Sequence, residues 1–450
     1  MNFKILAKKI IPEKILNRFI PLYHKILAYL AAIIYRFPSD KMIIIGVTGT
    51  KGKSSTTIMI AKVLEKTGEN VGFASTAGFQ IGKKNWINDK KMTMLGRFQL
   101  QKLLRDMSDA GCKYAVIETS SEGIKQSRHK GIDYDYLVFT NLSPEHIESH
   151  KGFDNYKKAK LTIFKELIES KRKEIGGKKI RKVIVVNNDD KYANEFLKNK
   201  ADVKITYALE NQNSLIKASE LRISEKGTDF KLREMEIHLR LAGGFNVYNA
   251  LAATAIGLEE GLDMDKIAAA LEEIKVIPGR MEFINEGQDY FVVVDYAHEP
   301  SSMEQVFKTL KVLSEAKKIN RIIHIFGSCG GGRDKSKRRI LGRISAKNAD
   351  ISIITNEDPY DEKPEDIIEE IKKGVLEEKN LEDFNLFAII DRKESIRKAF
   401  ELAGKNDLVL ITGKGCEQTM CVKQGKQIRW DDRETAREEI KKLSSYGNNL

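Results

Sequence analysis

The stretch that decides the fold runs Met42-Ile-Ile-Ile-Gly46-Val-Thr48-Gly49-Thr50-Lys51-Gly52-Lys53-Ser54-Ser55-Thr56. It joins an apolar β-branched run to a glycine-rich turn and then to a helical pattern, which is the arrangement of a phosphate-binding loop. Glycines let backbone N–H groups approach phosphates, Lys53 supplies a positive charge, and the Ser54 hydroxyl is a ligand type that Mg²⁺ accepts. The spacing departs from plain G-x-x-x-x-G-K-[ST], because Val47 stands where that motif has its first glycine.

Short apolar runs continue to alternate with helical patterns along the chain. This alternation predicts an α/β fold with mostly parallel sheets covered by helices. A first series of buried strands is predicted at residues 42–47, 114–118, 136–140 and 183–187. A second series is predicted at 291–295, 322–326, 351–355, 387–390 and 408–412. We expect a P-loop ATPase-like domain followed by a Rossmann-like domain.

The run Ile277-Pro278-Gly279-Arg280 interrupts the helical pattern and predicts a domain boundary and a hinge. The expected units are a basic amphipathic segment at 1–41, a central ATP-binding domain at 42–278 and a C-terminal domain at 279–450. Shorter alternating runs between 205 and 241 predict a small antiparallel accessory sheet before a helix that begins near Asn246. The lysine-rich segment 169–181 is expected to be a solvated surface connection.

The composition is that of ordinary globular protein, with 450 residues, 41% hydrophobic and 31% charged. The net charge of +13 suits an anionic partner such as a nucleotide, a polycarboxylate, a membrane surface or nucleic acid, and does not choose among them. Four scattered cysteines lack the paired spacing of a zinc site, which favours a reducing cytoplasm.

Lysines at the N-terminus precede an apolar stretch from Ile26 to Tyr35. That stretch is about ten residues long, whereas roughly twenty are needed to span a bilayer. No small-residue cleavage site follows it, which argues against a signal peptide. We expect an amphipathic segment that packs within the protein, with peripheral membrane contact as the alternative.

The phosphate loop resembles the ATP loop of the Mur ligases, which usually reads T-G-T-N-G-K, with Lys51 replacing the customary asparagine. Further matches follow in the family's order: Glu118-Thr-Ser-Ser-Glu-Gly, Asn141-Leu-Ser-Pro-Glu-His146, Tyr156-Lys-Lys-Ala-Lys160, Phe245-Asn-Val-Tyr-Asn249-Ala, Pro278-Gly-Arg280-Met-Glu and Asp295-Tyr-Ala-His298. Gly330-Gly-Gly-Arg333-Asp-Lys, Glu357-Asp358-Pro359 and Gly413-Lys-Gly-Cys-Glu417 resemble the muramoyl-tripeptide synthetase branch, which adds the third peptide residue. The resemblance implies an ATP-dependent ligase that forms an amide bond through an acyl phosphate, in peptidoglycan precursor synthesis.

A carboxylate and an imidazole lie at predicted strand ends. Glu118 ends one strand and His146 follows another, so both can converge above the sheet. The resemblance implies two Mg²⁺ ions held by Ser54, Glu118, His146 and Lys160. It also implies that CO₂ carbamylates Lys160, because a second cation needs oxygen ligands and an ammonium would repel it. Lys53, Glu118, His146 and Lys160 are thus the expected catalytic residues.

The remaining ATP contacts are expected on both sides of the domain boundary. Asn246 and Asn249 lie one helical turn apart, so both amides can reach an adenine edge, while helix capping is the alternative interpretation. The resemblance assigns ATP binding to Gly49, Thr50, Gly52, Lys53, Ser54, Ser55, Asn246, Asn249, Arg280 and Asp295. Contacts shared between domains imply closure, which protects an acyl phosphate from water.

The resemblance also implies a muramoyl-peptide-like donor and an amino-acid acceptor, with no nucleic-acid partner and a monomeric state. Thr93, Ser120 and Arg128 correspond to donor-binding residues, although the segment around Thr93 lacks the usual T-T-P. Arg333 matches the arginine that grips the acceptor carboxylate, a task that suits a planar guanidinium. The other expected substrate contacts are His298, Asp358, Tyr360, Gly413 and Glu417.

Two features depart from the family. Full-length relatives carry a uridine-binding domain of about a hundred residues, whereas 41 residues precede Met42, so that domain is expected to be absent and a lipid-linked or other donor stays open. Diaminopimelate-adding members read D-N-P-R, and this chain has Asp358 and Tyr360 in place of the asparagine and arginine. With Asp361 and Glu362 following, we expect a basic acceptor such as lysine or ornithine.

Two other functions are compatible with parts of the sequence. Folylpolyglutamate or polyglutamate ligases share the ATP loop, but they do not explain the motifs around Gly330 and Gly413. A non-catalytic nucleotide- or nucleic-acid-binding protein would use the positive charge, but it leaves Lys160 and Arg333 unexplained.

Overall fold

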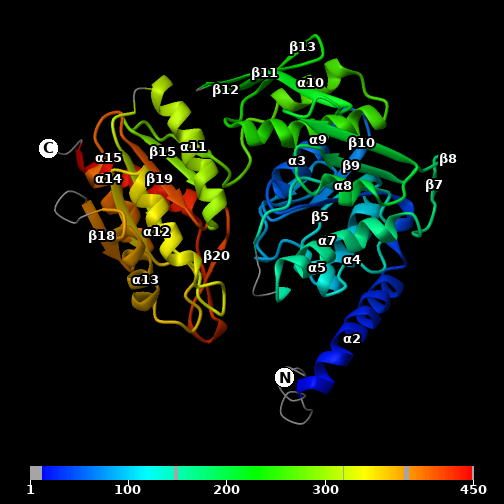
Figure 1. The fold of residues 1–450 in the computed structure, drawn as a ribbon, viewed down its shortest axis with the longest axis horizontal. Coiled ribbons are helices and arrows are strands. Elements are labelled where there is room, and N and C mark those ends of the chain that lie inside the picture. The colour runs from blue at the N-terminus through cyan, green and yellow to red at the C-terminus, as the bar shows by residue number, and fades with distance from the viewer. Residues whose placement is uncertain (1–12, 146–149, 225, 318, 380–384, 448–450) are drawn as a thin grey trace.

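The computed structural model describes residues 13–145, 150–224, 226–317, 319–379 and 385–447. Two large β-sheets, each covered by helices, lie side by side, and a helix near the N-terminus projects from the first (Figure 1). The chain completes the first sheet before it begins the second. The α/β architecture predicted from the alternating pattern is confirmed.

The first sheet has the strand order β13-β12-β11-β10-β9-β6-β1-β5-β2-β3-β4. The strands from β11 to β2 in this order pair in parallel, while β3 and β4 at one edge and β12 and β13 at the other are antiparallel. Its strands are β1 Ile43–Thr48, β2 Asn70–Ala74, β3 Phe79–Ile81, β4 Lys84–Trp86, β5 Cys112–Glu118, β6 Tyr136–Phe139, β9 Val183–Asn187, β10 Val203–Ala208, β11 Ile216–Ser224, β12 Gly227–Leu232 and β13 Met235–Leu239. The predicted accessory sheet is the antiparallel β11–β13 edge.

The second sheet has the strand order β14-β15-β19-β16-β17-β18, with β14 antiparallel and the rest parallel. Its strands are β14 Glu282–Ile284, β15 Phe291–Asp295, β16 Ile322–Phe326, β17 Ile351–Thr355, β18 Asn385–Ile389 and β19 Leu408–Thr412. Two hairpins complete the strands: β7 Glu174–Ile175 with β8 Lys178–Lys179, and β20 Thr419–Cys421 with β21 Gln427–Arg429. All nine strands predicted from apolar runs are present, with shifts of at most two residues at their ends.

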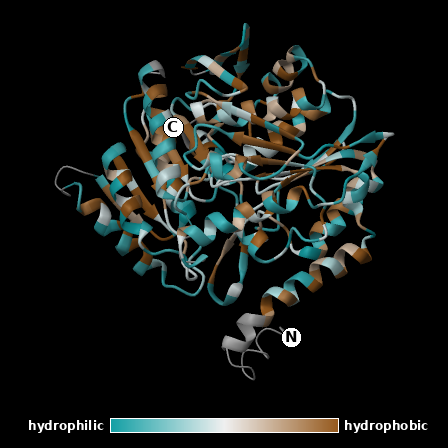
Figure 2. Ribbon diagram, turned by 45° about the vertical axis from the view of Figure 1, so that its right-hand side comes forward, coloured by the Kyte–Doolittle hydropathy of each residue, from teal (hydrophilic) through white to brown (hydrophobic). Residues whose placement is uncertain are grey.

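The helices that cover the first sheet are α2 Glu13–Ile34, α3 Lys53–Glu65, α4 Arg97–Asp109, α5 Ser121–Lys125, α7 Phe153–Leu167, α8 Ala193–Leu197, α9 Gly244–Glu259 and α10 Met264–Glu272, with the 3₁₀ turn η1 Pro38–Lys41. Those of the second are α11 Pro300–Lys317, α12 Lys337–Asn348, α13 Pro364–Leu376, α14 Arg392–Leu402 and α15 Asp432–Gly447, with the 3₁₀ turn η2 Lys423–Gly425. In the colouring by hydropathy, brown residues concentrate on the strands between teal helix faces (Figure 2).

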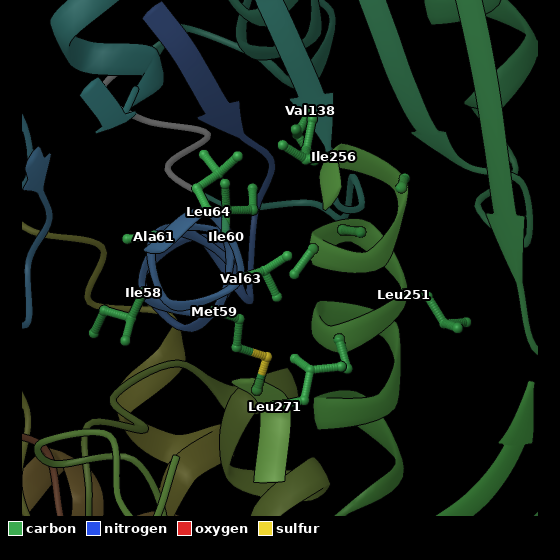
Figure 3. Close-up of a cluster of buried hydrophobic side chains, with 14 of the residues drawn as sticks. Ile58, Met59, Ile60, Ala61, Val63, Leu64, Val138, Leu251, Ile256 and Leu271 are labelled. Atoms are coloured by element: carbon green, nitrogen blue, oxygen red, sulfur yellow. The ribbon is translucent and has the colours of Figure 1, made fainter. Parts of the chain in front are cut away.

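Both faces of the first sheet are covered at β1, where all six residues are buried. Ile43, Ile45 and Val47 pack with α3 and α9, while Ile44 faces the side covered by α4 and α7. Helix α3 begins directly after the phosphate loop and is buried on nearly all sides. Figure 3 shows its Met59 and Val63 among residues of α9 and α10. Because a packed core tolerates little movement, this burial holds the start of α3 in place.

The lysine-rich segment 169–181 is mostly exposed, as expected, except at Lys173. It forms the β7–β8 hairpin, and Lys173 is buried with its Nζ 2.5 Å from Asp135 Oδ2. Lys182 also lies 3.1 Å from Asp135 Oδ1, and all three side chains have at most 1% of their surface exposed. Lys173 is the exception because the buried carboxylate at the start of β6 needs cationic partners, which Lys173 and Lys182 supply.

Helix α2 confirms the expected packing of the amphipathic N-terminal segment, but for one face only. Ala28, Ala31 and Ala32 are buried against the first sheet's helices, close to Gly131. The opposite face carries large exposed apolar side chains. No helix within the described residues is long and apolar enough to cross a bilayer.

Candidate active site

The phosphate loop follows β1 and leads directly into α3. Two of its glycines have positive φ, +154° at Gly49 and +78° at Gly52. A Cβ at Gly49 would lie 1.9 Å from Thr140 Oγ1, and one at Gly52 would lie 2.5 Å from Asn249 Oδ1. Both positions therefore require glycine, and the resulting close backbone turn at a helix N-terminus is suited to phosphate oxygens.

Ser54, Lys53 and Glu118 meet at this helix start. Ser54 Oγ donates to Glu118 Oε2 over 2.8 Å, and the same carboxylate oxygen accepts from the backbone N of Thr76 at 2.7 Å. Lys53 Nζ donates to the carbonyl of Thr50 at 2.8 Å, so the lysine folds back over the loop. The predicted convergence of a strand-end carboxylate with the phosphate loop is present in the structure.

Arg280, two residues before β14 of the second sheet, reaches the same point. Its Nη2 donates to Ser54 Oγ over 3.4 Å, and its guanidinium lies 4.3 Å from the ring centre of Tyr296. Asp295, at the end of β15, accepts from the backbone N of Met281 and of Ala297, both at 2.7 Å. Burial raises the pKa of Asp295, against the lowering effect of Arg280. Arg280 thus extends from the second sheet onto the loop of the first.

Asn246 and Asn249 are both buried on α9, beside α3. Asn249 Oδ1 accepts from Thr56 Oγ1 at 3.0 Å, and Asn249 Nδ2 donates to Asn246 Oδ1 at 3.3 Å. Asn246 Nδ2 donates to the carbonyl of Ala242 at 2.9 Å. The pair lies together, as the helical spacing predicted, with Asn249 directly against Gly52 of the phosphate loop.

Lys160 projects from α7 to the other side of the loop. Its Nζ donates to the carbonyl of Gly49 over 2.6 Å and lies 4.6 Å from the ring centre of Tyr156, whose hydroxyl is 3.1 Å from Thr50 Oγ1. Burial, followed by the charge of Lys53, holds the pKa of Lys160 well below its ordinary value. A neutral amine is the form of lysine that reacts with CO₂, so the surroundings of this residue suit carbamylation.

The oxygens of Ser54 and Glu118 are hard donors of the type that Mg²⁺ prefers, and the loop that carries them fits a nucleotide triphosphate. Within the described ranges, no three His, Cys, Asp or Glu side chains form a metal-binding group by themselves. His146, the fourth expected ligand, lies outside the described residues. A cation here would therefore share its ligands among hydroxyl, carboxylate and phosphate oxygens.

The three expected donor-binding residues lie close together at one end of the first sheet. Thr93 Oγ1 accepts from Thr76 Oγ1 at 3.0 Å, next to Glu118. Ser120 caps α5, with its Oγ accepting from the N of Gly123 at 3.1 Å. Arg128 donates to the carbonyl of Met94, one residue from Thr93. Thr93, despite its unusual sequence context, is therefore near the phosphate loop.

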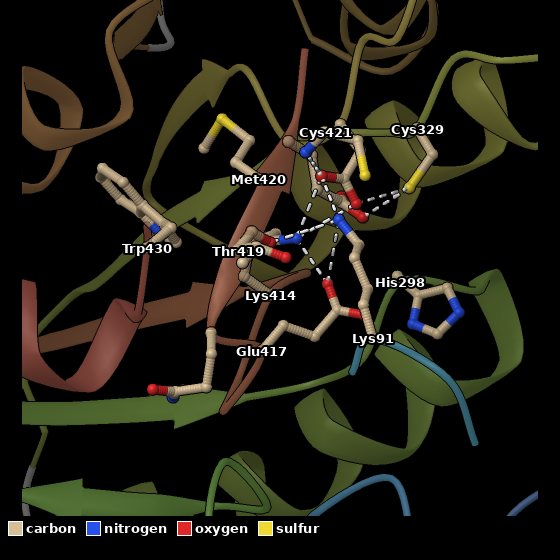
Figure 4. Close-up of polar contacts among 12 residues, drawn as sticks. Lys91, His298, Cys329, Lys414, Glu417, Thr419, Met420, Cys421 and Trp430 are labelled. Carbon is tan, nitrogen blue, oxygen red and sulfur yellow. Dashed lines mark hydrogen bonds and ion pairs between the residues drawn. The ribbon is translucent and has the colours of Figure 1, made fainter. Parts of the chain in front are cut away.

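A cluster of opposite charges joins the two sheets (Figure 4). Asp358 accepts from Lys414 Nζ, with both oxygens 3.1 Å away, and from Lys91 Nζ at 2.6 Å. Glu417 also accepts from Lys414 and lies 3.8 Å from Lys91. Although burial opposes it, the charges of Lys414 and Lys91 lower the pKa of Asp358. We name Lys91, Asp358, Lys414 and Glu417 the interdomain charge cluster.

The other expected acceptor residues surround this cluster. Arg333 has an exposed side chain on the glycine-rich turn after β16. Tyr360, with a φ of +52°, packs on Gly331, where a Cβ would lie 2.6 Å from the tyrosine ring. Gly413 has a φ of +114°, and a Cβ there would lie 2.7 Å from Glu357 Oε2. His298 Nδ1 lies 2.8 Å from the carbonyl of Tyr296.

The reversed local charge expected beside Tyr360 is not found. Asp358 is balanced by two lysines, and Glu362 pairs with Lys335 at 3.1 Å and Arg338 at 3.0 Å. The sequence argument for a basic acceptor counted only the acidic run 358–362 and missed the cations that the fold brings from distant segments. Its electrostatic premise is therefore wrong.

Lys91, Lys414 and Tyr156 were not chosen from the sequence. Lys414 and Tyr156 lie within the recognised motifs that contain Glu417 and Lys160. Their position in those motifs was a sequence signal that could have identified both residues. Lys91 precedes the segment that departs from the T-T-P pattern, and no local feature indicated its partner 267 positions away.

Fold and site together define a nucleotide-binding α/β protein whose phosphate loop is completed by a second parallel sheet. Comparison with protein families agrees: residues 47–257 match the Mur ligase middle domain, and 279–415 match the Mur ligase, glutamate ligase domain. The chain belongs to the Mur ligase family, whose members are ATP-dependent amide-bond ligases.

Two individual comparisons support this membership, and a third shows a shared fold. The chain is 37% identical over 429 residues to UDP-N-acetylmuramoyl-L-alanyl-D-glutamate--2,6-diaminopimelate ligase 1 of Clostridium acetobutylicum, covering 93% of this chain and 82% of the relative. A solved structure of a ligase with the same substrate name is 30% identical, with a TM-score of 0.59, covering 90% of this chain and 79% of that one. The Mycobacterium tuberculosis folylpolyglutamate synthase complexed with ADP shares the fold, with a TM-score of 0.66 at 16% identity, covering 87% of this chain and 92% of that one.

Proposed function

We propose that this ligase couples UDP-N-acetylmuramoyl-L-alanyl-D-glutamate to a diamino acid, using ATP and passing through an acyl phosphate. The names of its relatives suggest the donor. The convergence on Ser54 carries the proposal: Glu118 reaches it from the first sheet and Arg280 from the second. A phosphoryl group held there would be contacted from both sides, as transfer to a carboxylate requires.

In this proposal the phosphate loop, from Gly49 to Ser55, holds the ATP phosphates. Lys53 turns from the Thr50 carbonyl to the terminal phosphate, and Asn246, Asn249 and Asp295 bind the nucleoside. Two Mg²⁺ ions bound by Ser54, Glu118, His146 and carbamylated Lys160 would supply charge neutralisation for the triphosphate. The low pKa and burial of Lys160 support the carbamate, in which the amine adds CO₂ and releases a proton.

The domain division at residue 278 belongs to the same proposal. Residues 42–278 carry the ATP loop and 279–450 the acceptor site, with 1–41 as a separate N-terminal segment. Closure of one on the other excludes water from the acyl phosphate until the amine attacks. We place the reaction in the cytoplasm, where ATP is supplied, and expect a monomer because one chain holds both halves of the site.

The substrates are assigned to the two ends of this site. The donor peptide is bound by Thr93, Ser120 and Arg128. The α-carboxylate of the acceptor is bound by the planar guanidinium of Arg333 in a bidentate contact. His298, Tyr360 and Gly413 line the same side. The interdomain charge cluster has two cations and two anions, so it does not repel a distal carboxylate. This balance and the relatives' names favour 2,6-diaminopimelate.

The test is direct synthesis with the purified chain, ATP, Mg²⁺ and bicarbonate. The donors are UDP-N-acetylmuramoyl-L-alanyl-D-glutamate and, in a parallel reaction, a reduced folate with glutamate as acceptor. We expect the muramoyl donor to gain the mass of one amino acid less water, with one ADP per product. Product from the folate alone, or ADP release without any amide product, would contradict the proposal.

A further inference from the structure

Helix α2 presents an apolar face that the rest of the described chain does not cover. Large apolar side chains along it, and at Phe37 just beyond its end, have between 37% and 60% of their surface exposed. Half of the large hydrophobic residues that are exposed in the whole described structure lie on this short segment. They are Phe19, Leu22, Tyr23, Ile26, Tyr29, Leu30, Ile33, Ile34 and Phe37. A contiguous apolar surface of this kind marks an interaction site.

The exposed residues recur at intervals of one or three, so they form one stripe along the helix. The opposite stripe is fixed to the body. Ala32 packs so closely on Gly131 that a Cβ there would lie 2.6 Å from the alanine. Arg97 Nε donates to the carbonyl of His24 at 3.0 Å. The direction of the apolar stripe is therefore set, and the helix points away from both sheets (Figures 1 and 2).

The charged residues of this N-terminal segment are almost all of one sign, positive. Between Glu13 and Asp40 the sequence has no acidic residue, and the first 39 residues contain seven Lys or Arg against one Glu. Lys25 and Arg36 are exposed beside the apolar stripe. Exposed Tyr23 and Tyr29 add rings with one apolar and one polar end, which suit a membrane interface.

We propose that α2 docks the enzyme on an anionic bilayer surface, with its apolar stripe among the acyl chains and its cations at the headgroups. An amphipathic helix of 22 residues with a basic border is of the type that lies in the plane of the interface. A second copy is a poorer occupant, because pairing two stripes would bring together two segments of the same positive charge.

The docking helix also adjoins the expected donor residues. The carbonyl of Gln126 accepts from Arg97, which holds His24 of α2, and lies 3.2 Å from His24 Nδ1. The side chain of the same Gln126 accepts from Arg128 Nη2 at 2.9 Å. One residue thus links the membrane-facing helix to the donor end of the site.

The experiment is flotation of the full chain with vesicles of phosphatidylcholine alone or with phosphatidylglycerol. We expect binding to the anionic vesicles, weakened when salt rises from about 0.05 to about 0.5 M. The double variant Ile26→Asp/Ile33→Asp should lower the apparent partition coefficient by about tenfold or more. The matched control is Leu215→Asp, which alters a similarly exposed apolar residue just before β11 and should bind like wild type.

Circular dichroism and ATP-dependent ligation verify that the variants fold, since neither position contacts the active site. Light scattering without vesicles tests the second copy. The proposal is overturned if wild type ignores anionic vesicles, if Ile26→Asp/Ile33→Asp floats as well as wild type, or if the stripe instead holds a dimer that the double variant separates. Failure of membrane binding leaves the ligase assay unaffected, so the two conclusions are tested separately.

Discussion

Lys91 and Asp358 form a buried ion pair, Nζ to Oδ1 2.6 Å, between the edge of the first sheet and the end of a strand in the second. Both side chains have little exposure, 11% and 4%. Such a pair depends on its geometry more than a surface pair does, because an unpartnered buried charge is costly. The contact joins the segment after β4 to the segment after β17, and in the proposed function it lies between the donor and acceptor ends of the site.

Replacement of Lys91 by Ala should lower kcat/KM for the amino acid by about tenfold or more, because Asp358 keeps only Lys414 and the closed arrangement loses an interdomain contact. The neighbouring Lys90→Ala is the matched control, since Lys90 is exposed and pairs with the adjacent Asp89. Steady-state kinetics with the amino acid varied measures both. Equal effects of the two variants would remove the role of Lys91 in the site.

Diaminopimelate should outcompete L-lysine when both are present at equal concentration, as read from product masses. The balanced charge of the interdomain cluster permits a distal carboxylate, and Lys91→Glu should shift the preference toward lysine because it leaves three anions and one cation. A wild-type preference for lysine would restore the expectation drawn from the acidic run at 358–362.

Lys53→Ala should reduce ATP-dependent ligation by about 10²–10³-fold with the fold intact, because a charge on the transferring phosphoryl group is lost. Lys62→Ala lies on the same helix, pairs with Glu65 on the surface and serves as the control. Product formation and thermal unfolding are measured on both variants. Near-normal turnover in folded Lys53→Ala would exclude the loop from phosphate binding.

Lys160→Ala should be nearly inactive and regain part of its activity with added short carboxylates, which replace the carbamate oxygens. Wild type should lose activity when CO₂ is stripped from the buffer and also as the pH falls, because acid protonates the amine and removes the carbamate. Lys158→Ala, on the exposed side of the same helix, controls for charge. Full activity of wild type without CO₂ would argue against the modification.

Acid should weaken the second sheet through His324. This residue is fully buried, lies 2.8 Å from Ser345 Oγ and 2.9 Å from Thr412 Oγ1, and burial together with Arg392 lowers its pKa to about 3. Because the unfolded chain takes up the proton near pH 6.5, this part of the stability is complete above that pH and is lost as the pH falls toward 3. Urea unfolding should show about 2 kcal/mol lost by pH 5 from this group. In His324→Gln, the pH dependence should be smaller by that amount.

Much of the fold could be predicted because its strands are short and apolar between clear breaks. Phe291–Asp295 and Leu408–Thr412 have the limits that the sequence indicated, since both strands are buried on both faces. The burial of Lys173 was not predicted, because lysines usually indicate solvent and this one is buried beside the carboxylate of Asp135. That pairing depends on a contact between segments far apart in the chain.

The candidate site, like the fold, could be predicted only where the argument stays within one sheet. Ser54 and Glu118 could be placed together because parallel strands end at one edge of a sheet, and Gly49 and Gly52 because the loop requires them. Partners from the other sheet, such as Lys91 on Asp358, depend on how two domains meet. No periodicity along the sequence encodes that orientation.

The segment that connects the sheets has a consequence for the order of events in catalysis. Gly279, with a φ of +61°, packs so tightly on the following loop that a Cβ would lie 2.3 Å from the N of Cys416 and 2.7 Å from the carbonyl carbon of Gly415. Arg280 follows Gly279, while Lys414 and Glu417 flank Gly415 and Cys416, so neither end can shift without the other. A nucleotide that draws Arg280 inward must carry the acceptor loop with it. We therefore expect the amino acid to bind after ATP, in an order set by the backbone packing at Gly279.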